Sequence, residues 1–381
     1  MIRLLIVDDS PLMRQLLTEI FAEAGDFETG TARNADEALA QLSAFQPDVV
    51  TLDIHMPGMD GLACLDRIMV ERPTPVVMLS SLTEAGADET LEALALGAVD
   101  FIPKPRGPLS IEIEGIAATL VAKVREAASA RIPRSARLTE RVRRRAAATR
   151  LAGGSAAPIR PSMPRQAATA IPPRRRPARL PSHGKAEALS GIEAVLVGVS
   201  TGGPSALDAL LGPLPADFPW PIVIAQHMPS SFTGPLARRL DRGCAIAVEE
   251  VRQPRPLRPG TAYIGRGDAD LIFSRRDGVP QILAAPMRAD RLWHPSADRL
   301  VESARVLFPP GALVAVLMTG MGHDGAEAMA ALHRDGGHVL AQDEASSVVW
   351  GMPGALVAAG GADLVLPLEE LVAQLLAWAQ G

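Results

Sequence analysis

The sequence has few of the residues on which several protein classes depend. It has only two cysteines, Cys64 and Cys244, which are too few and too far apart for a disulfide framework or a cysteine-rich zinc site. Aromatic residues make up 3% of the chain, which argues against an aromatic-rich β-sandwich. No run of about 20 apolar residues occurs, and acids arrive too early for a signal peptide. We therefore expect a cytoplasmic protein that is not inserted into a membrane.

The chain is long enough for two or three domains, and its charge is unevenly distributed. The 381 residues are 48% hydrophobic, so more than one core can be buried. Residues 1–130 contain 9 basic and 21 acidic residues, residues 131–181 contain 14 and 1, and residues 182–381 contain 15 and 21. A basic block therefore separates two acidic ones.

The basic block has the composition of a linker. It is rich in proline, alanine and arginine and has no apolar period, so it cannot bury enough surface to offset the entropy of ordering. It has no aromatic residues for base stacking, so nucleic acid is not an expected partner. We predict an N-terminal domain over residues 1–128, a flexible linker over 129–189 and a C-terminal domain over 190–381.

Short apolar runs alternate with amphipathic stretches in the N-terminal domain. This alternation is typical of an α/β fold with an open, doubly wound parallel sheet. The expected strands are Leu4–Val7, Val49–Leu52, Val76–Leu79 and Val99–Ile102, and the expected helices are 11–24, 35–44, 61–70, 84–96 and 109–128.

Polar residues follow these apolar runs, at the sheet edge where ligands bind in such folds. They are Asp8, Asp9, Asp53, Ser80 and Lys104. Three carboxylates at one edge repel one another and need a cation, and oxygen ligands suit Mg²⁺. A lysine and a hydroxyl beside them suit a phosphoryl group. Any one of these acids could instead be a helix cap, but five such residues at strand ends favour a site.

With these residues in place, the N-terminal domain resembles the receiver domain of bacterial response regulators. The resemblance rests on the Asp8–Asp9 pair, the segment from Leu52 to Gly61, Ser80 and Lys104-Pro105. It implies that Asp53 accepts a phosphoryl group, that Asp8 and Asp9 join Asp53 in binding Mg²⁺, and that Ser80 and Lys104 respond to the phosphate.

Three residues around this pattern need separate mention. His55 stands where many receiver domains have an acid, and Pro103 stiffens the loop before Lys104. Pro105 is expected to follow a cis peptide bond that directs Lys104 inward. Neither of the first two removes a required charge.

The C-terminal domain begins with a strand that leads into a Gly-x-Ser-x-Gly turn. The residues from Ala194 to Val199 are apolar, Ser200 follows, and Gly198 and Gly202 flank the serine. This pattern is typical of a nucleophile elbow, in which serine occupies a strained turn between a strand and a helix. A glycine-rich phosphate loop or a plain turn fits the same residues, so the motif alone leaves these possibilities open.

A nucleophilic serine needs a base, and the base needs an acid to orient it. His227 ends the next apolar strand, and Asp324 follows the buried strand around Leu313–Met318, so both reach the same sheet edge as Ser200. His323 competes as the base, but it stands directly beside Asp324, and both side chains could hardly point in line toward Ser200. The order Ser, His, Asp differs from that of ordinary α/β-hydrolases.

The C-terminal domain resembles the catalytic domain of the chemotaxis protein-glutamate methylesterases. A receiver domain followed by this domain is the arrangement of that family, so each half supports the other. The motifs that carry the resemblance are Gly198–Gly203, Ala225–Thr233, Tyr263–Asp268, His294–Asp298, Met318–Gly325 and Ala341–Pro353.

This resemblance implies a second doubly wound α/β domain and an enzyme. The expected reaction is hydrolysis of glutamate γ-methyl esters on methyl-accepting chemoreceptors, with release of methanol, and deamidation of receptor glutamines. Ser200 would be the nucleophile, His227 the base and Asp324 its orienting acid, with the backbone amides of Thr201 and Met321 as the oxyanion hole. No cofactor is expected at this hydrolase site, and a chemotaxis histidine kinase is the implied phosphoryl donor.

Two positions depart from the family pattern, and two other functions remain to be weighed. His323 replaces a common asparagine, and Asp270 lies where relatives often have a histidine.

A transcriptional regulator would have a helix-turn-helix domain of about 70–100 residues, which the acidic α/β sequence does not resemble. A binding module with an inactive hydrolase domain is disfavoured by the presence of Ser200, His227 and Asp324. A receiver domain docked over the cleft would block it until phosphorylation shifts the population.

Overall fold

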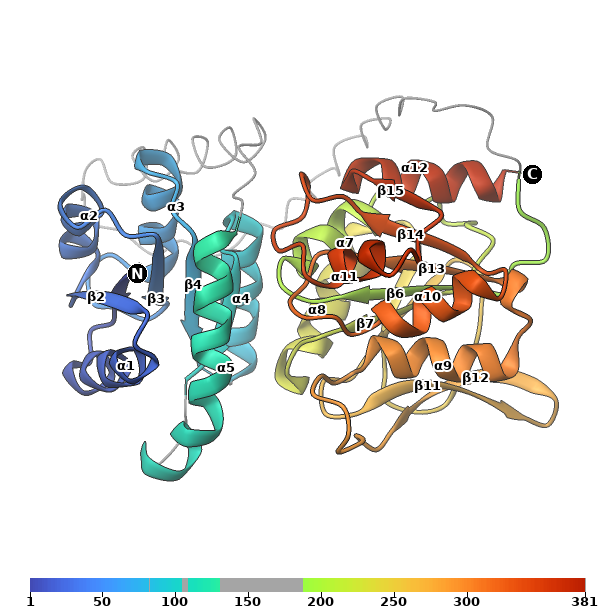
Figure 1. Ribbon diagram of the computed structural model, residues 1–381, viewed down its shortest axis with the longest axis horizontal. Coiled ribbons are helices and arrows are strands. Elements are labelled where there is room, and N and C mark those ends of the chain that lie inside the picture. The colour runs from blue at the N-terminus through green and yellow to red at the C-terminus, as the bar shows by residue number, and fades with distance from the viewer. Residues whose placement is uncertain (82, 105–108, 131–187, 381) are drawn as a thin grey trace, which may run out of the picture.

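The computed structural model describes residues 1–81, 83–104, 109–130 and 188–380 (Figure 1). Most of the expected linker, and the peptide bond before Pro105, lie outside the described residues. The helices in the described part of the chain are all too short or too polar to cross a membrane.

The N-terminal domain has a five-stranded parallel sheet with the strand order β2-β1-β3-β4-β5. Four of these strands confirm the expected ones, and β2 adds an edge strand that the sequence pattern did not indicate. The strands are β1 (Ile2–Val7), β2 (Phe27–Ala32), β3 (Val49–Asp53), β4 (Val76–Ser80) and β5 (Asp100–Pro103).

Five helices cover the two faces of this sheet, and they begin and end within a residue of the expected positions. Alternate strand residues point to opposite faces, so Leu4 and Ile6 pack with α1 and α5 while Leu5 and Val7 pack with the other three helices. Ser10 caps the first helix at its N-terminus and Gly25 ends it. The helices are α1 (Pro11–Ala24), α2 (Ala35–Ala44), α3 (Gly61–Glu71), α4 (Glu84–Leu96) and α5 (Leu109–Ser129).

The C-terminal domain has a seven-stranded parallel sheet with the order β15-β14-β13-β6-β7-β10-β8. This confirms the second parallel α/β domain. The strands are β6 (Ala194–Val199), β7 (Ile222–Gln226), β8 (Ala247–Val251), β10 (Thr261–Gly265), β13 (Leu313–Leu317), β14 (His338–Gln342) and β15 (Leu364–Leu366).

Helices again lie on both faces of the sheet (Figure 1). One face carries α7 (Gly203–Leu211), α8 (Ser230–Gly243) and α12 (Leu368–Ala379); the other carries α9 (Ala297–Leu307), α10 (Ala326–Arg334) and α11 (Met352–Ala358). A short 3-10 helix, Pro310–Ala312, precedes β13. A small antiparallel sheet of β9 (Arg255–Pro256), β11 (Asp270–Arg276) and β12 (Val279–Ala285) packs against α9 and was not expected from the sequence.

The strand order places a binding crevice at the carboxyl end of β6. From β6 the chain moves first to β7 on one side and later to β13 on the other. Such a reversal leaves an opening beyond the strand ends, where ligands bind in open α/β sheets. The residues that follow β6, β7 and β13 are therefore the ones that can meet there.

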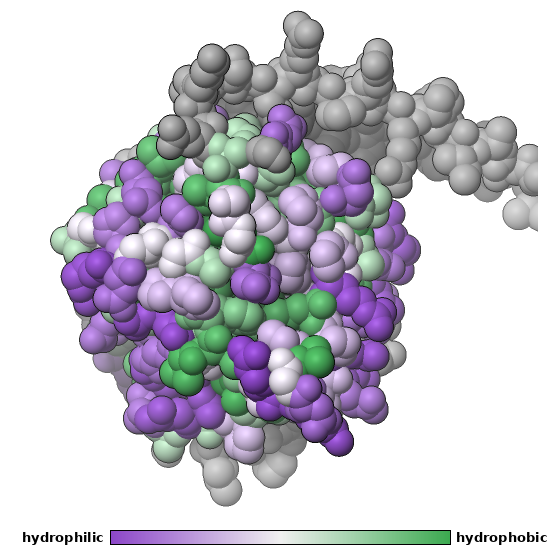
Figure 2. All heavy atoms as spheres, turned by 90° about the vertical axis from the view of Figure 1, so that its right-hand side faces the viewer, coloured by the Kyte–Doolittle hydropathy of each residue, from purple (hydrophilic) through white to green (hydrophobic). Residues whose placement is uncertain are grey.

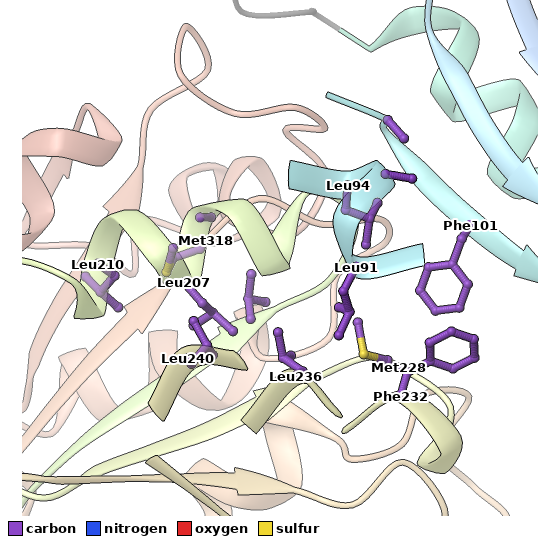
Figure 3. Close-up of a cluster of buried hydrophobic side chains, with 14 of the residues drawn as sticks. Leu91, Leu94, Phe101, Leu207, Leu210, Met228, Phe232, Leu236, Leu240 and Met318 are labelled. Carbon is purple, nitrogen blue, oxygen red and sulfur yellow. The ribbon is translucent and has the colours of Figure 1, made fainter. Parts of the chain in front are cut away.

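The two domains pack against each other through α4 and β5 of the first and α7 and α8 of the second (Figure 1). Figure 3 shows Leu91, Leu94 and Phe101 facing a cluster of leucines and methionines of the C-terminal domain. The rings of Phe101 and Phe232 are 4.3 Å apart at their centroids. Ser205 Oγ donates a hydrogen bond to the Leu94 carbonyl over 3.1 Å. The interface is thus apolar at its centre with polar bonds around it.

The opposite side of the C-terminal domain has a different character. Figure 2 shows hydrophilic residues surrounding smaller groups of hydrophobic ones on the side that faces away from the N-terminal domain. The carboxyl end of β6 lies toward the N-terminal domain instead, because Thr201, just beyond it, bonds to Asp100. The crevice beyond the carboxyl end of β6 therefore lies at the domain interface.

Candidate functional site

Ser200 occupies the turn between β6 and α7. Its amide donates to the Thr319 carbonyl over 3.0 Å, and its carbonyl accepts from the Gly203 amide over 2.8 Å. Gly202 has a φ of 77°, a conformation that glycine adopts without strain. A Cβ atom at Gly320 would lie 2.7 Å from Ser200 Cβ, so the chain after β13 can approach the serine closely only without a side chain there.

His227 and Asp324 form a buried pair beside this turn. His227 follows β7, Asp324 lies between β13 and α10, and His227 Nε2 is 2.8 Å from Asp324 Oδ2. The Nδ1 atom of His227 is buried and has no hydrogen-bond partner among the described residues. This nitrogen is thus unpaired in a residue that lines the same cleft as Ser200, while Nε2 is held by the acid.

Asp324 is held in its ionised form by donors at the start of α9. Its oxygens accept hydrogen bonds from the Ala297 amide at 2.6 Å, the Asp298 amide at 3.1 Å and Ser296 Oγ at 2.9 Å. Burial alone would raise the pKa of Asp324, but the bonds from His227 and these amides hold it below its usual value. A helix N-terminus favours the negative charge as well.

The pKa of Asp298, which belongs to the same cluster, shifts in the opposite direction. Burial raises the pKa of Asp298 to about 6, with the charge of Asp324 adding to the shift. Its carboxylate accepts bonds from Arg291 at 3.0 Å and the Ala328 amide at 3.1 Å. Asp324 is therefore the acid that stays charged beside His227.

The backbone amides of Thr201 and Met321 make no hydrogen bond to another described residue. Both residues are buried next to the serine turn, Thr201 directly after Ser200 and Met321 after Gly320. Their N–H groups are available to a developing oxyanion. His323 is exposed, whereas its neighbour Asp324 is buried.

Trp293 and His294 complete the cleft around Ser200 and His227. The cleft has a volume of about 380 Å³, and its walls include Met228, Met287 and Leu292 from the C-terminal domain. The ring of Trp293 stacks on that of His227, with 5.5 Å between centroids and 9° between planes. Sequence reasoning missed this stacking partner. The only indication was that Trp293 stands directly before the His294–Asp298 motif.

The N-terminal domain supplies one wall of the same cleft. Phe101, Ile102, Pro103, Thr119 and Lys123 line it. Asp100 also reaches the serine turn directly, since Thr201 Oγ1 donates a 2.7 Å hydrogen bond to Asp100 Oδ2. The two domains therefore share one cleft.

The N-terminal domain gathers most of its own expected site residues. Carboxylate oxygens of Asp8, Asp9 and Asp53 lie within 4.8 Å of one another. Lys104 Nζ is 2.8 Å from Asp8 Oδ2 and from Asp53 Oδ2. Burial would lower the pKa of Lys104, but its bonds to Asp53 and Asp8 raise it, so the ammonium is charged.

This arrangement fits a hard divalent cation. Asp8 Oδ2 is buried and lies 2.8 Å from Lys104 Nζ, and a carboxylate oxygen has two lone pairs, so it can also bind a cation. Three carboxylates at this spacing offer the oxygen ligands that Mg²⁺ prefers. The donor set therefore fits the expected metal.

Ser80 contacts Lys104 through the backbone, since the Lys104 amide donates to the Ser80 carbonyl over 2.7 Å, but its hydroxyl is engaged by α4. Its hydroxyl contacts Thr90 Oγ1 at 2.5 Å and the Gly86 carbonyl at 3.2 Å, both on α4. His55 forms an exposed pair with Glu89, also on α4, at 3.2 Å. His55, after β3, and Ser80, at the end of β4, thus connect the strand ends near the acidic cluster to the helix that packs on the other domain.

Comparisons with known proteins agree with this division of the chain. Residues 4–112 match the family model described as "Response regulator receiver domain", and residues 195–375 match "CheB methylesterase". A protein-glutamate methylesterase/protein-glutamine glutaminase 2 of Rhodopseudomonas palustris (strain BisB18) is 54% identical over 99% of this chain and 98% of its own length. A similarly named protein 3 of Rhodospirillum rubrum is 50% identical over 99% and 96%.

One solved structure covers the C-terminal half. The crystal structure of the Thermotoga maritima CheB methylesterase catalytic domain is 35% identical, spans 48% of this chain and 97% of that one, and has a TM-score of 0.47.

Proposed function

This chain belongs to the CheB methylesterase family, and we propose that it is a phosphorylation-activated serine hydrolase that demethylates glutamate γ-methyl esters on chemoreceptors. The most similar proteins reported above carry the name protein-glutamate methylesterase/protein-glutamine glutaminase. The observation that supports this function best is the His227–Asp324 pair beside the serine turn, in a chain that also carries the Asp53 cluster.

In the first half of the reaction Ser200 Oγ attacks the ester carbonyl carbon. His227 Nδ1 takes the hydroxyl proton and passes it to the leaving methoxide, so methanol departs and a Ser200 acyl ester remains. Asp324 holds the ring through Nε2 and stabilises the imidazolium that forms. The amides of Thr201 and Met321 donate to the oxyanion of the tetrahedral intermediate.

In the second half water cleaves the acyl ester. His227 removes a proton from the water and returns one to Ser200, and the receptor side chain leaves as a glutamate carboxylate. The same steps with a glutamine substrate release ammonia in place of methanol. This accounts for both activities in the names of the relatives.

The N-terminal domain would receive the phosphoryl group on Asp53 from a histidine kinase. Asp8, Asp9 and Asp53 would hold Mg²⁺, which neutralises charge on the phosphoryl oxygens when bound. Lys104 would pair with the new charge, and Ser80 would turn from α4 toward it.

The contacts at the domain interface support a route by which this modification would control hydrolysis. A receptor helix must reach Ser200, but Phe101, Ile102 and Pro103 line the cleft and Asp100 bonds to Thr201. Movement of Ser80 would disturb α4, which packs on α7 and α8. Phosphorylation would then shift the population toward an undocked arrangement in which the cleft is open.

The direct test is methanol release from membranes that carry radiomethylated chemoreceptors. We expect release by the full chain, stimulation by a phosphoryl donor with Mg²⁺, and no release by Ser200→Ala. A wild-type chain that folds but releases no methanol with or without the donor would refute the proposal and favour a binding module.

A further inference from the structure

The catalytic cleft contains a second histidine that is also held by a buried acid. His294 lines the cleft together with Ser200 and His227. Its Nδ1 atom is 2.8 Å from Asp270 Oδ1, and Asp270 is fully buried at the start of β11. The mechanism above uses neither residue.

Asp270 is fixed by further donors. Its Oδ1 accepts a bond from the Ser296 amide at 2.9 Å, and its Oδ2 accepts one from Arg299 at 2.6 Å. Although burial opposes it, the bonds from His294, Ser296 and Arg299 lower the pKa of Asp270, so it is a carboxylate near neutral pH. A carboxylate only accepts hydrogen bonds, so the facing His294 Nδ1 carries a hydrogen.

Ser296 connects this pair to the catalytic pair. Its amide donates to Asp270, and its hydroxyl donates to Asp324 Oδ1 over 2.9 Å. Ser296 is itself fully buried. His294 and His227 are therefore held by two carboxylates that one residue joins, and both rings lie on the same cleft.

This geometry leaves His294 Nε2 for a substrate. His294 Nε2 makes no hydrogen bond to the described residues. It is also not one of the fully buried polar atoms that lack a partner among them. With Nδ1 protonated, the Nε2 of a neutral imidazole has a lone pair and acts as an acceptor. A glutamine side chain offers two N–H donors to such an acceptor, whereas a glutamate methyl ester offers none.

We propose that His294 is a substrate-contacting residue whose Nε2 accepts a hydrogen bond from the side-chain amide of glutamine, and that it thereby favours deamidation relative to demethylation. The inference rests on the proposed function. His294 exchanges no proton: Ser200 Oγ bonds to the amide carbon, the C–N bond breaks, and ammonia leaves with the proton that His227 delivers. His294 orients the nitrogen that departs.

The test compares two helical receptor peptides that differ at one position, which is glutamate γ-methyl ester in one and glutamine in the other. The full chain is assayed with a phosphoryl donor and Mg²⁺, and kcat/KM is measured for methanol and for ammonia release. His294→Asn keeps an N–H near Asp270 but lacks Nε2. Loss of one net hydrogen bond should lower the amide-to-ester ratio about three- to ten-fold.

Two further variants make the result specific. His294→Gln extends a carbonyl toward the Nε2 position and should restore part of the ratio. His333→Asn is the matched control, because His333 also pairs with an aspartate, Asp363, at 3.3 Å, but lies on α10 outside the cleft. It should leave the ratio unchanged.

The outcomes separate this inference from the proposed function. Equal loss of both activities in His294→Asn, or no change in the ratio, overturns the role of His294 while the hydrolase assignment stands. A wild-type chain that releases methanol but no ammonia also overturns it. A wild-type chain that releases neither refutes the proposed function itself.

Discussion

The strongest test of domain control is to weaken the apolar interface without touching the cleft. Leu91 is 1% exposed on α4 and faces the C-terminal domain in Figure 3. Replacing a buried leucine by alanine costs about 2–5 kcal/mol. We take the lower end for an interface, about 2 kcal/mol, which corresponds to about a 30-fold shift in the docking equilibrium.

We therefore expect Leu91→Ala to raise methanol release in the absence of a phosphoryl donor by up to about 30-fold. The ceiling is the activity of a protein lacking residues 1–181. The backbone carbonyl of Leu91, which accepts a bond from Arg239 at 3.2 Å, is kept, so the loss is confined to apolar contact.

The control is Leu12→Ala, because Leu12 on α1 is 57% exposed and away from the interface. It should leave basal activity unchanged. If Leu91→Ala folds normally, as judged by its unfolding midpoint, and still has wild-type basal activity, this interface does not restrain the enzyme.

Four further outcomes follow from the site. Ser200→Ala should lower turnover by several orders of magnitude with unfolding unchanged; retention of about a tenth of the activity would exclude Ser200 as nucleophile. His227→Ala should be nearly as damaging, whereas His323→Asn should be mild because His323 is exposed; the reverse ranking in kcat would identify His323 as the base. Asp53→Ala, or removal of Mg²⁺ by a chelator, should abolish stimulation by a phosphoryl donor and preserve basal methanol release; stimulation that persists would place the acceptor elsewhere. Burial raises the pKa of Cys64 to about 12 and of Cys244 to about 11, so neither thiol should react with a thiol reagent at pH 8 until the protein is unfolded, as titration with and without denaturant would test.

The sequence predicts most of the fold because most strands and helices carry their own local pattern. The expected helices agree with α1 to α5, since their apolar periods and caps are local features. Strand β2 escaped prediction because only its end residues, Phe27 and Ala32, are buried. The antiparallel strands β11 and β12 form a hairpin in which only Asp277 and Gly278 separate the paired residues Arg276 and Val279. This Asp-Gly turn is a local signal for a hairpin that the sequence analysis missed.

The part of the candidate site that lies at the ends of strands can be predicted from the sequence. Ser200, His227 and Asp324 each follow a buried parallel strand, and the structure brings the last two into contact. The pairing of His294 with Asp270 was not predictable, because β11 belongs to the small sheet and the position of Asp270 had suggested only a departure from the family. The position of the Ser80 hydroxyl depends on Thr90 and Gly86, which no motif specifies.

The bond between Asp100 and Thr201 also determines how easily the two domains can separate. Asp100 Oδ1 accepts from the Phe101 amide at 2.7 Å, and Lys123 Nζ lies 3.0 Å from both of its oxygens. When the domains separate, the Asp100 carboxylate loses the Thr201 hydroxyl donor but keeps the Lys123 ammonium. Separation therefore avoids the cost of about 3–5 kcal/mol for leaving a buried charge without its partner. Shifting the ratio of separated to docked molecules from 1:99 to 99:1 needs about 5.5 kcal/mol. We expect separation to be readily reversible, so that phosphorylation, if it acts as proposed, would open the enzyme and loss of the phosphoryl group would close it again.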